Sequence, residues 1–190
     1  MKLIGSITSP YVRRIRLLLG NTDYQFVKLD IYGEDRDELR RNNPALKIPM
    51  LVDGNQEVYD SRVIARYISE KQGLAPLTWD QENQLTLIDA ANDSAVILLL
   101  ASRSGIDISE NLMFFNLQRE RIMITMQTLA AMVDDGQFSQ WNYPAICLHS
   151  MVDWVDFRDL VDFTGTESLL SFRDHHRNDE LVSATDPRKS

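Results

Sequence analysis

A helix start that could bind an anion lies at Asp60-Ser61, directly before an amphipathic segment, residues 62–71. Asp60 is a favourable N-cap, and a helix N-terminus attracts anions through its unpaired N–H groups. Pro49 lies a few residues upstream and lacks an N–H, so it fits the first position of a strand, where a cis bond would turn the chain. The stretch of residues 43–61 is therefore predicted to form a surface that binds something peptide-like and acidic.

A second helix start lies at Ser9-Pro10. Proline is well placed at the first helical position, so Ser9 is expected to be the N-cap. A hydroxyl there, beside backbone N–H groups and the positive end of the helix dipole, could stabilise a bound thiolate, since a free thiol has a pKa of about 8.5. Thr8 is an alternative source of this hydroxyl if the register shifts by one residue. Capping alone would also account for Ser9.

The remaining reactive side chains form no recognisable constellation. His175 and His176 are adjacent and point apart on a helix, and with His149 they make no metal-ligand spacing, so no metal is expected. Cys147 is the one cysteine, which rules out an internal disulfide and fits a reducing cytosol. We expect it to be a small core residue.

The elements that would position these groups alternate between strand and helix in the first half of the chain. The expected elements are a strand at residues 2–5, a helix at 10–19, a strand at 26–29, a short polar helix at 35–41, two strands joined at Asp53-Gly54, and a helix at 62–71. A strand, helix and strand of this length form a βαβ unit, so the first two strands should be parallel. The pattern alone predicts a mixed sheet flanked by helices.

Residues 72–76 break this pattern and are the expected domain boundary. We therefore predict a domain at residues 1–75 and a second, all-helical domain at residues 76–190. The polar tail from residue 178 is expected to be loosely ordered.

Helical signals follow the boundary. Thr78 begins a capping box, and apolar residues recur at helical spacing over residues 115–133. A third long helix begins near Pro144, where Asn142 is the available cap. The arginines of residues 13–16, in the first half, are expected to lie on a solvated face.

Composition places the chain among soluble globular proteins, with 44% hydrophobic and 25% charged residues. Residues 1–75 carry 12 basic and 10 acidic side chains, whereas residues 76–190 carry 8 and 18. The acidic balance argues against nucleic-acid binding. The longest apolar run, residues 95–101, is far shorter than the ~20 residues that span a bilayer, and no signal peptide is visible, so we expect a cytoplasmic protein without a membrane segment.

Two motifs carry a resemblance to a known family. Asn-Pro-x-x-Lys-Ile-Pro-x-Leu begins at residue 43 and is followed by Asp-Ser at a helix start, while residues 6–14 read Ser-Ile-Thr-Ser-Pro-Tyr-Val-Arg-Arg. Together they resemble the N-terminal half of the cytosolic glutathione S-transferases, and most of all the small bacterial members with a Ser-Pro active site. The match is specific over about the first 75 residues and diffuse beyond them.

This resemblance implies a thioredoxin-like N-terminal domain, of the α/β class, followed by an all-α C-terminal domain. It implies a homodimer that takes glutathione as co-substrate, with Ser9 or Thr8 stabilising its thiolate for attack on a small hydrophobic electrophile. Some relatives have Cys-Pro-Tyr where this chain has Ser9-Pro10-Tyr11. A serine cannot form a mixed disulfide, so disulfide exchange at this position is excluded.

The resemblance also assigns the residues that would bind glutathione. The backbone of Ile48, before Pro49, pairs with the cysteinyl backbone as a strand would. Ser61 binds the γ-glutamyl carboxylate and Asp60 lies close to the amine. Lys47 would face the glycyl carboxylate, although a solvated lysine is an equal alternative.

Two other functions stay open at the level of sequence. The helix near Pro144 lacks the Ser/Thr-x-x-Asp capping box usual in the family, and the second half is short. Both features favour a non-catalytic interaction protein that keeps the fold. A glutathione-dependent isomerase or dehalogenase shares the same first domain and would need a substrate panel to distinguish it.

Overall fold

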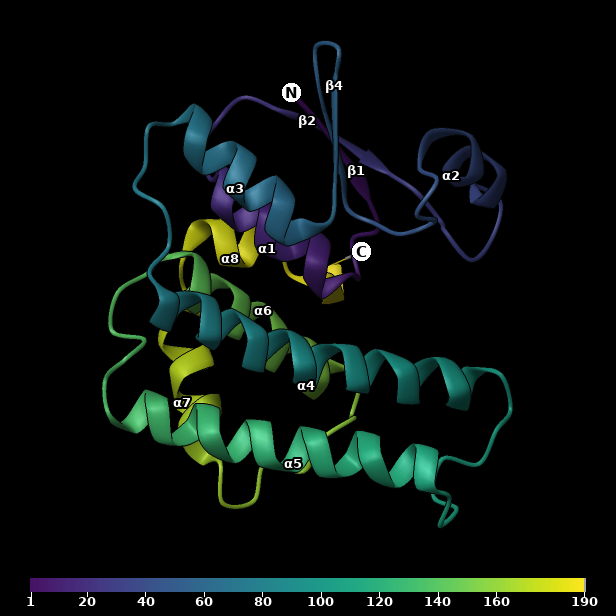
Figure 1. Cartoon of the computed structure of the whole chain (residues 1–190), viewed down its shortest axis with the longest axis vertical. Coiled ribbons are helices and arrows are strands. Elements are labelled where there is room, and N and C mark those ends of the chain that lie inside the picture. The colour runs from purple at the N-terminus through teal and green to yellow at the C-terminus, as the bar shows by residue number, and fades with distance from the viewer. Residues whose placement is uncertain (190) are drawn as a thin grey trace. The chain divides into compact units, whose positions relative to one another are not determined.

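The computed structural model describes residues 1–189, which form two compact units (Figure 1). One unit holds Met1–Leu77 together with the C-terminal residues from Asn178 onward, and the other holds Thr78–Arg177. The boundary thus falls close to the expected one, but the C-terminal residues belong to the first unit and not to the helical one.

A four-stranded sheet with strand order β2-β1-β3-β4 forms the centre of the first unit. The strands are β1 (Lys2–Gly5), β2 (Gln25–Lys28), β3 (Met50–Asp53) and β4 (Gln56–Tyr59). β1 pairs with β2 in parallel, as the βαβ spacing predicted, and β3 is antiparallel to both β1 and β4. With helices α1 (Pro10–Leu19), α2 (Arg36–Asn42) and α3 (Ser61–Lys71), this is the predicted β-α-β-α-β-β-α order. The prediction of a thioredoxin-like domain is confirmed.

Helix α1 packs closely on one face of this sheet. Alternate side chains of a strand point to opposite faces, so Leu3, Leu51 and Gly5 share a face. A Cβ added to Gly5 would lie 2.4 Å from Cγ2 of Val12 on α1, so only glycine allows the helix to come this near. Figure 1 shows α3 beside α1, and α2 apart from both.

The opposite face of the sheet has its own apolar cluster. Ile4 and Met50, which are cross-strand partners, pack with Leu29 from the segment after β2. All three side chains are at most 8% exposed. The sheet is therefore buried on both faces, which fixes its register, because a slip of one residue would exchange the two sets of side chains.

Four helices build the second unit: α4 (Trp79–Arg103), α5 (Met113–Asp134), α6 (Tyr143–Phe157) and α7 (Glu167–His175). α4 contacts α5 and α6, and α7 contacts α5 and α6. Thr78 begins α4 with a complete capping box, and Asn142 caps α6 by accepting from the N–H of Ala145 at 3.2 Å. Every residue of α6 from Tyr143 to Val155 is buried, Cys147 among them.

Helix α4 is long and apolar enough to cross a bilayer by length and composition. It contacts α5 and α6 within the helical unit, and buried polar side chains such as Gln84, Asn92 and Ser94 interrupt it. The unit is the helical C-terminal domain that was predicted.

The C-terminal segment was expected to be loosely ordered and to belong to the helical domain, and both expectations were wrong. It is not loosely ordered, because it forms α8 (Glu180–Ala184) and a 3-10 helix, η1 (Pro187–Lys189). It also packs on α1: Arg13 donates to the carbonyl oxygen of Val182 at 3.2 Å and to Oγ1 of Thr185 at 3.4 Å. The last carbonyls of a helix have no partner within it, so arginines from α1 satisfy those of α8.

The arginines of α1 were expected to be solvated, and this was wrong for two of them. Arg13 is 3% exposed and Arg14 is 2% exposed. Both lie on the buried face of α1. They stand three and four residues after the buried Pro10, and four and three residues before the buried Leu17. Their hydrogen bonds to other segments of the unit make this burial possible.

A cluster of Asp53, Tyr67 and Lys71 links the end of β3 to α3. The carboxylate of Asp53 accepts from the hydroxyl of Tyr67 at 2.8 Å and forms an ion pair with Lys71. The hydrogen bond from Lys71, and next that from Tyr67, hold the pKa of Asp53 below its ordinary value of 3.8. A carboxyl with a lower pKa in the folded state adds stability above its unfolded pKa and loses it as the pH falls through the folded pKa.

We expect the Asp53→Asn variant to depend less on pH than the wild type between neutral pH and pH values below 3.8. Thermal unfolding followed by circular dichroism across this range measures the difference. Asp37→Asn is the control, because Asp37 pairs with Arg40 on the surface, where ion pairs contribute little. Equal pH dependence in Asp53→Asn and the wild type would contradict the role of this cluster.

Candidate functional site

The strand register brings three separate segments to one end of the sheet. Ile4, near the end of β1, pairs with Met50 at the start of β3, and Met50 pairs with Tyr59 at the end of β4. The end of β1, the start of β3 and the end of β4 therefore lie at the same end of the sheet. The segments that meet there are residues 6–9, 47–49 and 60–61, which hold all seven predicted site residues.

Ser9 is the N-cap of α1, as predicted. Its side chain accepts from the N–H of Val12 at 3.3 Å, and its backbone is extended, with φ −84°. A serine hydroxyl has one proton to donate besides the lone pairs with which it accepts. Ser9 can therefore cap the helix and still donate to an anion at the helix N-terminus.

Thr8 lies in the turn before this cap, and its Oγ1 is 3.3 Å from Oγ of Ser6. Thr8 and Ser9 are both half-buried. They differ in their partners. The oxygen of Ser9 accepts from a backbone N–H of α1, whereas the hydroxyl of Thr8 lies next to the hydroxyl of Ser6. The helix N-terminus thus favours Ser9 as the group that meets an anion.

The loop before β3 is held in shape by Asn43, which is 1% exposed. Its Oδ1 accepts from the N–H two residues further on at 2.9 Å, and its Nδ2 donates to the carbonyl of Lys47 at 2.6 Å. The Ile48–Pro49 peptide bond is cis. The backbone pairing of β3 with β1 and β4 begins at Met50, so the backbone of Ile48 lies just before the paired residues. Sequence reasoning missed the role of Asn43, although an Asn followed by Pro is itself a turn signal.

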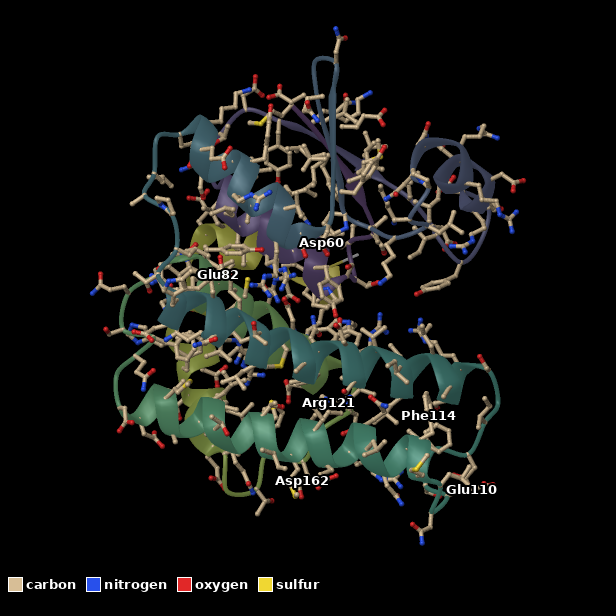
Figure 2. The ribbon with its side chains drawn as sticks, in the orientation of Figure 1. Asp60, Glu82, Glu110, Phe114, Arg121 and Asp162 are labelled. Carbon is tan, nitrogen blue, oxygen red and sulfur yellow. The ribbon has the colours of Figure 1, made fainter. Side chains whose placement is uncertain are left out.

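Asp60 caps α3 and lies at the start of that helix in Figure 2. Its Oδ1 accepts from the N–H groups of Arg62 at 2.8 Å and Val63 at 3.4 Å. Its φ of 68° lies in the left-handed region, which non-glycine residues rarely adopt and which recurs at ligand-binding sites. The hydrogen bonds of the cap offset this strain.

Ser61 is 1% exposed and follows Asp60 as the first residue of α3. Its Oγ accepts a hydrogen bond from Nη2 of Arg14, which is also buried. This contact between α1 and α3 was not predicted. The signal for it was present, since Arg14 stands four residues after Pro10 and three before Leu17, on the helix face that turns inward.

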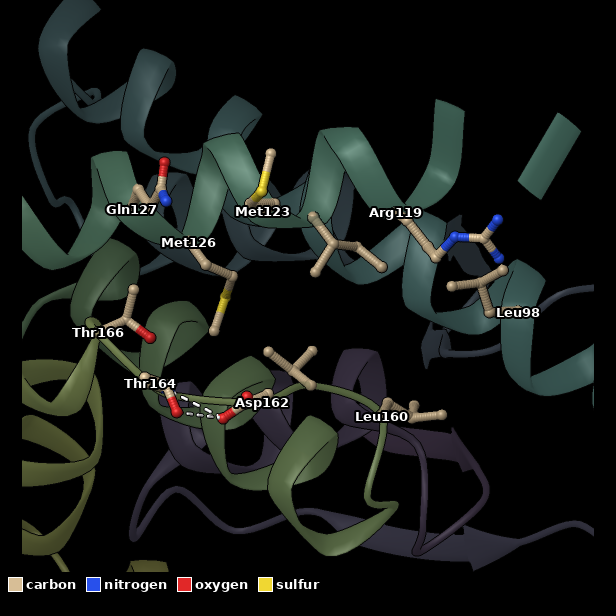
Figure 3. Close-up of a pocket in the computed structure, with 11 residues that line it drawn as sticks. Leu98, Arg119, Met123, Met126, Gln127, Leu160, Asp162, Thr164 and Thr166 are labelled. Atoms are coloured by element: carbon tan, nitrogen blue, oxygen red, sulfur yellow. Dashed lines mark hydrogen bonds between the residues drawn. The ribbon is translucent and has the colours of Figure 1, made fainter. Parts of the chain in front are cut away.

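A cavity of about 210 Å³ lies in the helical unit (Figure 3). Its floor includes the buried side chains Leu98, Ile122 and Met126. On its rim, the carboxylate of Asp162 accepts from the N–H and the hydroxyl of Thr164 at 2.9 and 2.8 Å, and these bonds lower the pKa of Asp162. None of the predicted site residues lines this cavity. Among residues 1–189, no three His, Cys, Asp or Glu side chains gather as metal ligands.

The sequence is similar to known proteins in its first half and, at lower identity, over most of its length. Residues 3–76 match the family described as glutathione S-transferase, N-terminal domain. An uncharacterised GST-like protein of Escherichia coli strain K12, YibF, is 30% identical over 172 residues, which cover 83% of each chain.

Solved structures share the fold of the whole chain. A glutathione S-transferase from Methylobacillus flagellatus, crystallised with glutathione bound, has a TM-score of 0.84 at 19% identity and covers 98% of each chain. A glutathione transferase family member from Pseudomonas fluorescens Pf-5, also with bound glutathione, has a TM-score of 0.81 at 24% identity and the same coverage.

The cap of α3 generates a prediction about stability. Asp60→Ala removes the acceptor for two backbone N–H groups and should destabilise the protein by about 1 kcal/mol. Asp60→Asn keeps a capping oxygen and tolerates the left-handed backbone, so it should stay close to the wild type. Urea unfolding of the three proteins measures the difference. An alanine variant as stable as the asparagine variant would contradict the role of the cap.

Proposed function

Because this chain belongs to the glutathione S-transferase family, we propose that it binds glutathione and activates the glutathione thiol for attack on a small electrophile. The observation that carries the proposal is the start of α1, where Ser9 caps the helix through its oxygen and keeps a proton to donate. A thiolate at this place would also meet the positive end of the helix dipole. Both effects lower the pKa of a bound thiol and so raise the fraction that is nucleophilic.

The backbone of glutathione would lie along the loop before β3. Ile48 would offer its N–H and C=O to the cysteinyl residue, as a neighbouring strand would, with Pro49 completing the turn. Lys47 is exposed and would face the glycyl carboxylate. Asn43 holds the carbonyl of Lys47 and thereby keeps this edge in one conformation, which lowers the entropy lost on binding.

The γ-glutamyl end would lie at the start of α3. Its carboxylate would accept from Ser61, and its ammonium would lie near the carboxylate of Asp60. A zwitterionic head group suits this place, because a helix N-terminus attracts the anion while an acidic cap attracts the cation.

The chemical step uses the thiol of the ligand and no thiol of the protein. The glutathione sulfur forms a bond to an electrophilic carbon, the leaving group departs with the electron pair of its former bond, and the thiol proton passes to solvent. Cys147 is buried in α6, a helix of the other unit, and takes no part. A buried thiol as the sole cysteine is consistent with the reducing cytoplasm, where we place the protein.

Ser9→Ala tests the thiol activation. Loss of one hydrogen bond to a charged group costs about 1.5–3 kcal/mol, so turnover of an activated aryl halide should fall roughly ten- to a hundredfold. The pKa of bound glutathione, followed by the ultraviolet absorbance of the thiolate against pH, should rise in the same variant. Thr8→Val is the matched control, because it removes the neighbouring hydroxyl and retains the β-branched shape.

The outcomes separate the two hydroxyls and the two classes of function. A fall in turnover for Thr8→Val, with Ser9→Ala unchanged, would reassign the hydroxyl to Thr8. Wild-type protein that binds no glutathione in a calorimeter would overturn the proposed function. Binding without turnover across aryl halides, haloalkanes and cis-enones would leave a glutathione-binding protein of the non-catalytic kind.

The homodimer that the family resemblance implies has a candidate surface on the helical unit. Met113, Leu117 and Ile124 recur on one face of α5 and are 46–78% exposed. Phe114, beside them at the N-terminal end of α5 in Figure 2, is 55% exposed. Contiguous exposed apolar side chains of this kind mark interaction sites in soluble proteins. We assign a second copy of the chain to this surface.

Leu117→Glu places a charge within the apolar stripe and should convert a dimer to a monomer, because an unpaired charge in an interface is costly. Light scattering coupled to gel filtration gives the mass directly. Met123→Glu is the control, since Met123 is 55% exposed on a different face of the same helix. A wild type that is monomeric at all concentrations would contradict the assignment, and so would equal effects of the two variants.

A further inference from the structure

A buried arginine contacts the serine to which the γ-glutamyl carboxylate is assigned. Arg14 on α1 is 2% exposed, and its Nη2 donates to Oγ of Ser61, which is 1% exposed. The guanidinium also lies 4.9 Å from the centroid of the Tyr11 ring, a cation–π distance. The bond to Ser61 crosses from α1 to α3 and joins residues 47 positions apart in the chain.

The chemistry of the two groups fixes the direction of this hydrogen bond. A guanidinium has five N–H donors and no acceptor, so Ser61 must accept. A serine hydroxyl has a single proton and two lone pairs. Since Arg14 takes one lone pair, the proton of Ser61 is donated in another direction. The charge of Arg14 also polarises the O–H bond, which strengthens the hydroxyl as a donor, because hydrogen bonds that involve a charged group are stronger.

The place of Ser61 sets what such a donor can bind. It is the first residue of α3, so its hydroxyl and its backbone N–H both lie at the helix N-terminus, where anions are favoured. The neighbouring carboxylate, Asp60, is already the acceptor for the N–H groups of Arg62 and Val63. A second carboxylate at this point would therefore depend on the donors of Ser61 and on the nearby charge of Arg14.

We propose that Arg14 is a positioning residue that orients and polarises the hydroxyl of Ser61 toward the α-carboxylate of the γ-glutamyl group, which rests on the proposed function. Arg14 does not contact the ligand in this arrangement. It acts through Ser61, so its effect is confined to ligands that carry the carboxylate. Ser61 with Arg14 selects the anionic half of an α-amino acid head group, and Asp60 selects the cationic half.

The test compares two ligands and two substitutions by calorimetry. The ligands are glutathione and γ-aminobutyryl-cysteinylglycine, which lacks only the α-carboxylate. Arg14→Met should weaken glutathione binding about tenfold or more, the scale of one charge-assisted hydrogen bond, and should leave the affinity for the second peptide unchanged. Because Arg14 acts through Ser61, the Arg14→Met/Ser61→Ala double variant should bind glutathione no more weakly than Ser61→Ala alone.

Kinetics separate positioning from a general structural role. Arg14→Met should raise the KM for glutathione while kcat at saturating glutathione stays within about twofold of the wild type, because the lost interaction concerns binding and not the reacting sulfur. Arg14→Lys should recover part of the affinity, since an ammonium supplies a donor and a charge without the planar fork. Arg66→Met is the matched control: Arg66 is exposed on α3, and its loss removes the same charge without touching Ser61.

Equal losses of affinity for both peptides in Arg14→Met would overturn the role of Arg14, and so would a fall in kcat without a change in KM. Should Arg14→Met fail to fold, Arg14→Lys and Ser61→Ala carry the same comparison, and equal losses for both peptides in these variants would overturn it. Wild-type protein that binds neither peptide would instead contradict the proposed function itself. The two failures are therefore distinguishable.

Discussion

The pairing of β3 with β1 on one side and with β4 on the other is the constraint on which the candidate site depends. Because Met50 pairs with both Ile4 and Tyr59, three loops far apart in the chain end at one edge of the sheet. Apolar side chains cover both faces of this sheet, so the register cannot slip without exposing one set of them. The register of the sheet therefore fixes where these three segments meet, although the site residues all lie in loops and at helix starts.

The two helix starts at this edge share one physical device. At each, a serine oxygen accepts from a donor of the protein, the N–H of Val12 for Ser9 and the guanidinium of Arg14 for Ser61. Neither donor can accept a hydrogen bond, so the proton of each hydroxyl is directed away from that donor. A ligand with a thiolate at one position and a carboxylate at the other would match this arrangement, which is the reasoning behind the proposal of a γ-glutamyl peptide.

Burial of charged side chains distinguishes α1 from an ordinary surface helix. Arg13 and Arg14 are buried because each has a defined partner: Arg13 bonds to the end of α8, and Arg14 to the start of α3. The C-terminal segment is thereby joined to the helix that carries Ser9. In the helical unit, Asn142 alone caps α6, whose buried apolar residues hold the helix in its core without the carboxylate that the family usually has at the third position.

The sequence by itself determined the local features of this protein. Proline at the first turn, Asp60 before an amphipathic run, Asp53-Gly54 between strands and the capping box at Thr78 each act through neighbouring residues, so each was predictable from spacing, and the family motif added the fold. Tertiary structure decided the features that residues adjacent in sequence do not determine. The burial of Arg13 and Arg14, the contact of Arg14 with Ser61, and the place of the C-terminal segment all depend on partners 47 to 172 positions away. From sequence alone an arginine is expected to be solvated, because its charge is costly to bury. Only the fold supplies the hydrogen-bond acceptors that offset this cost.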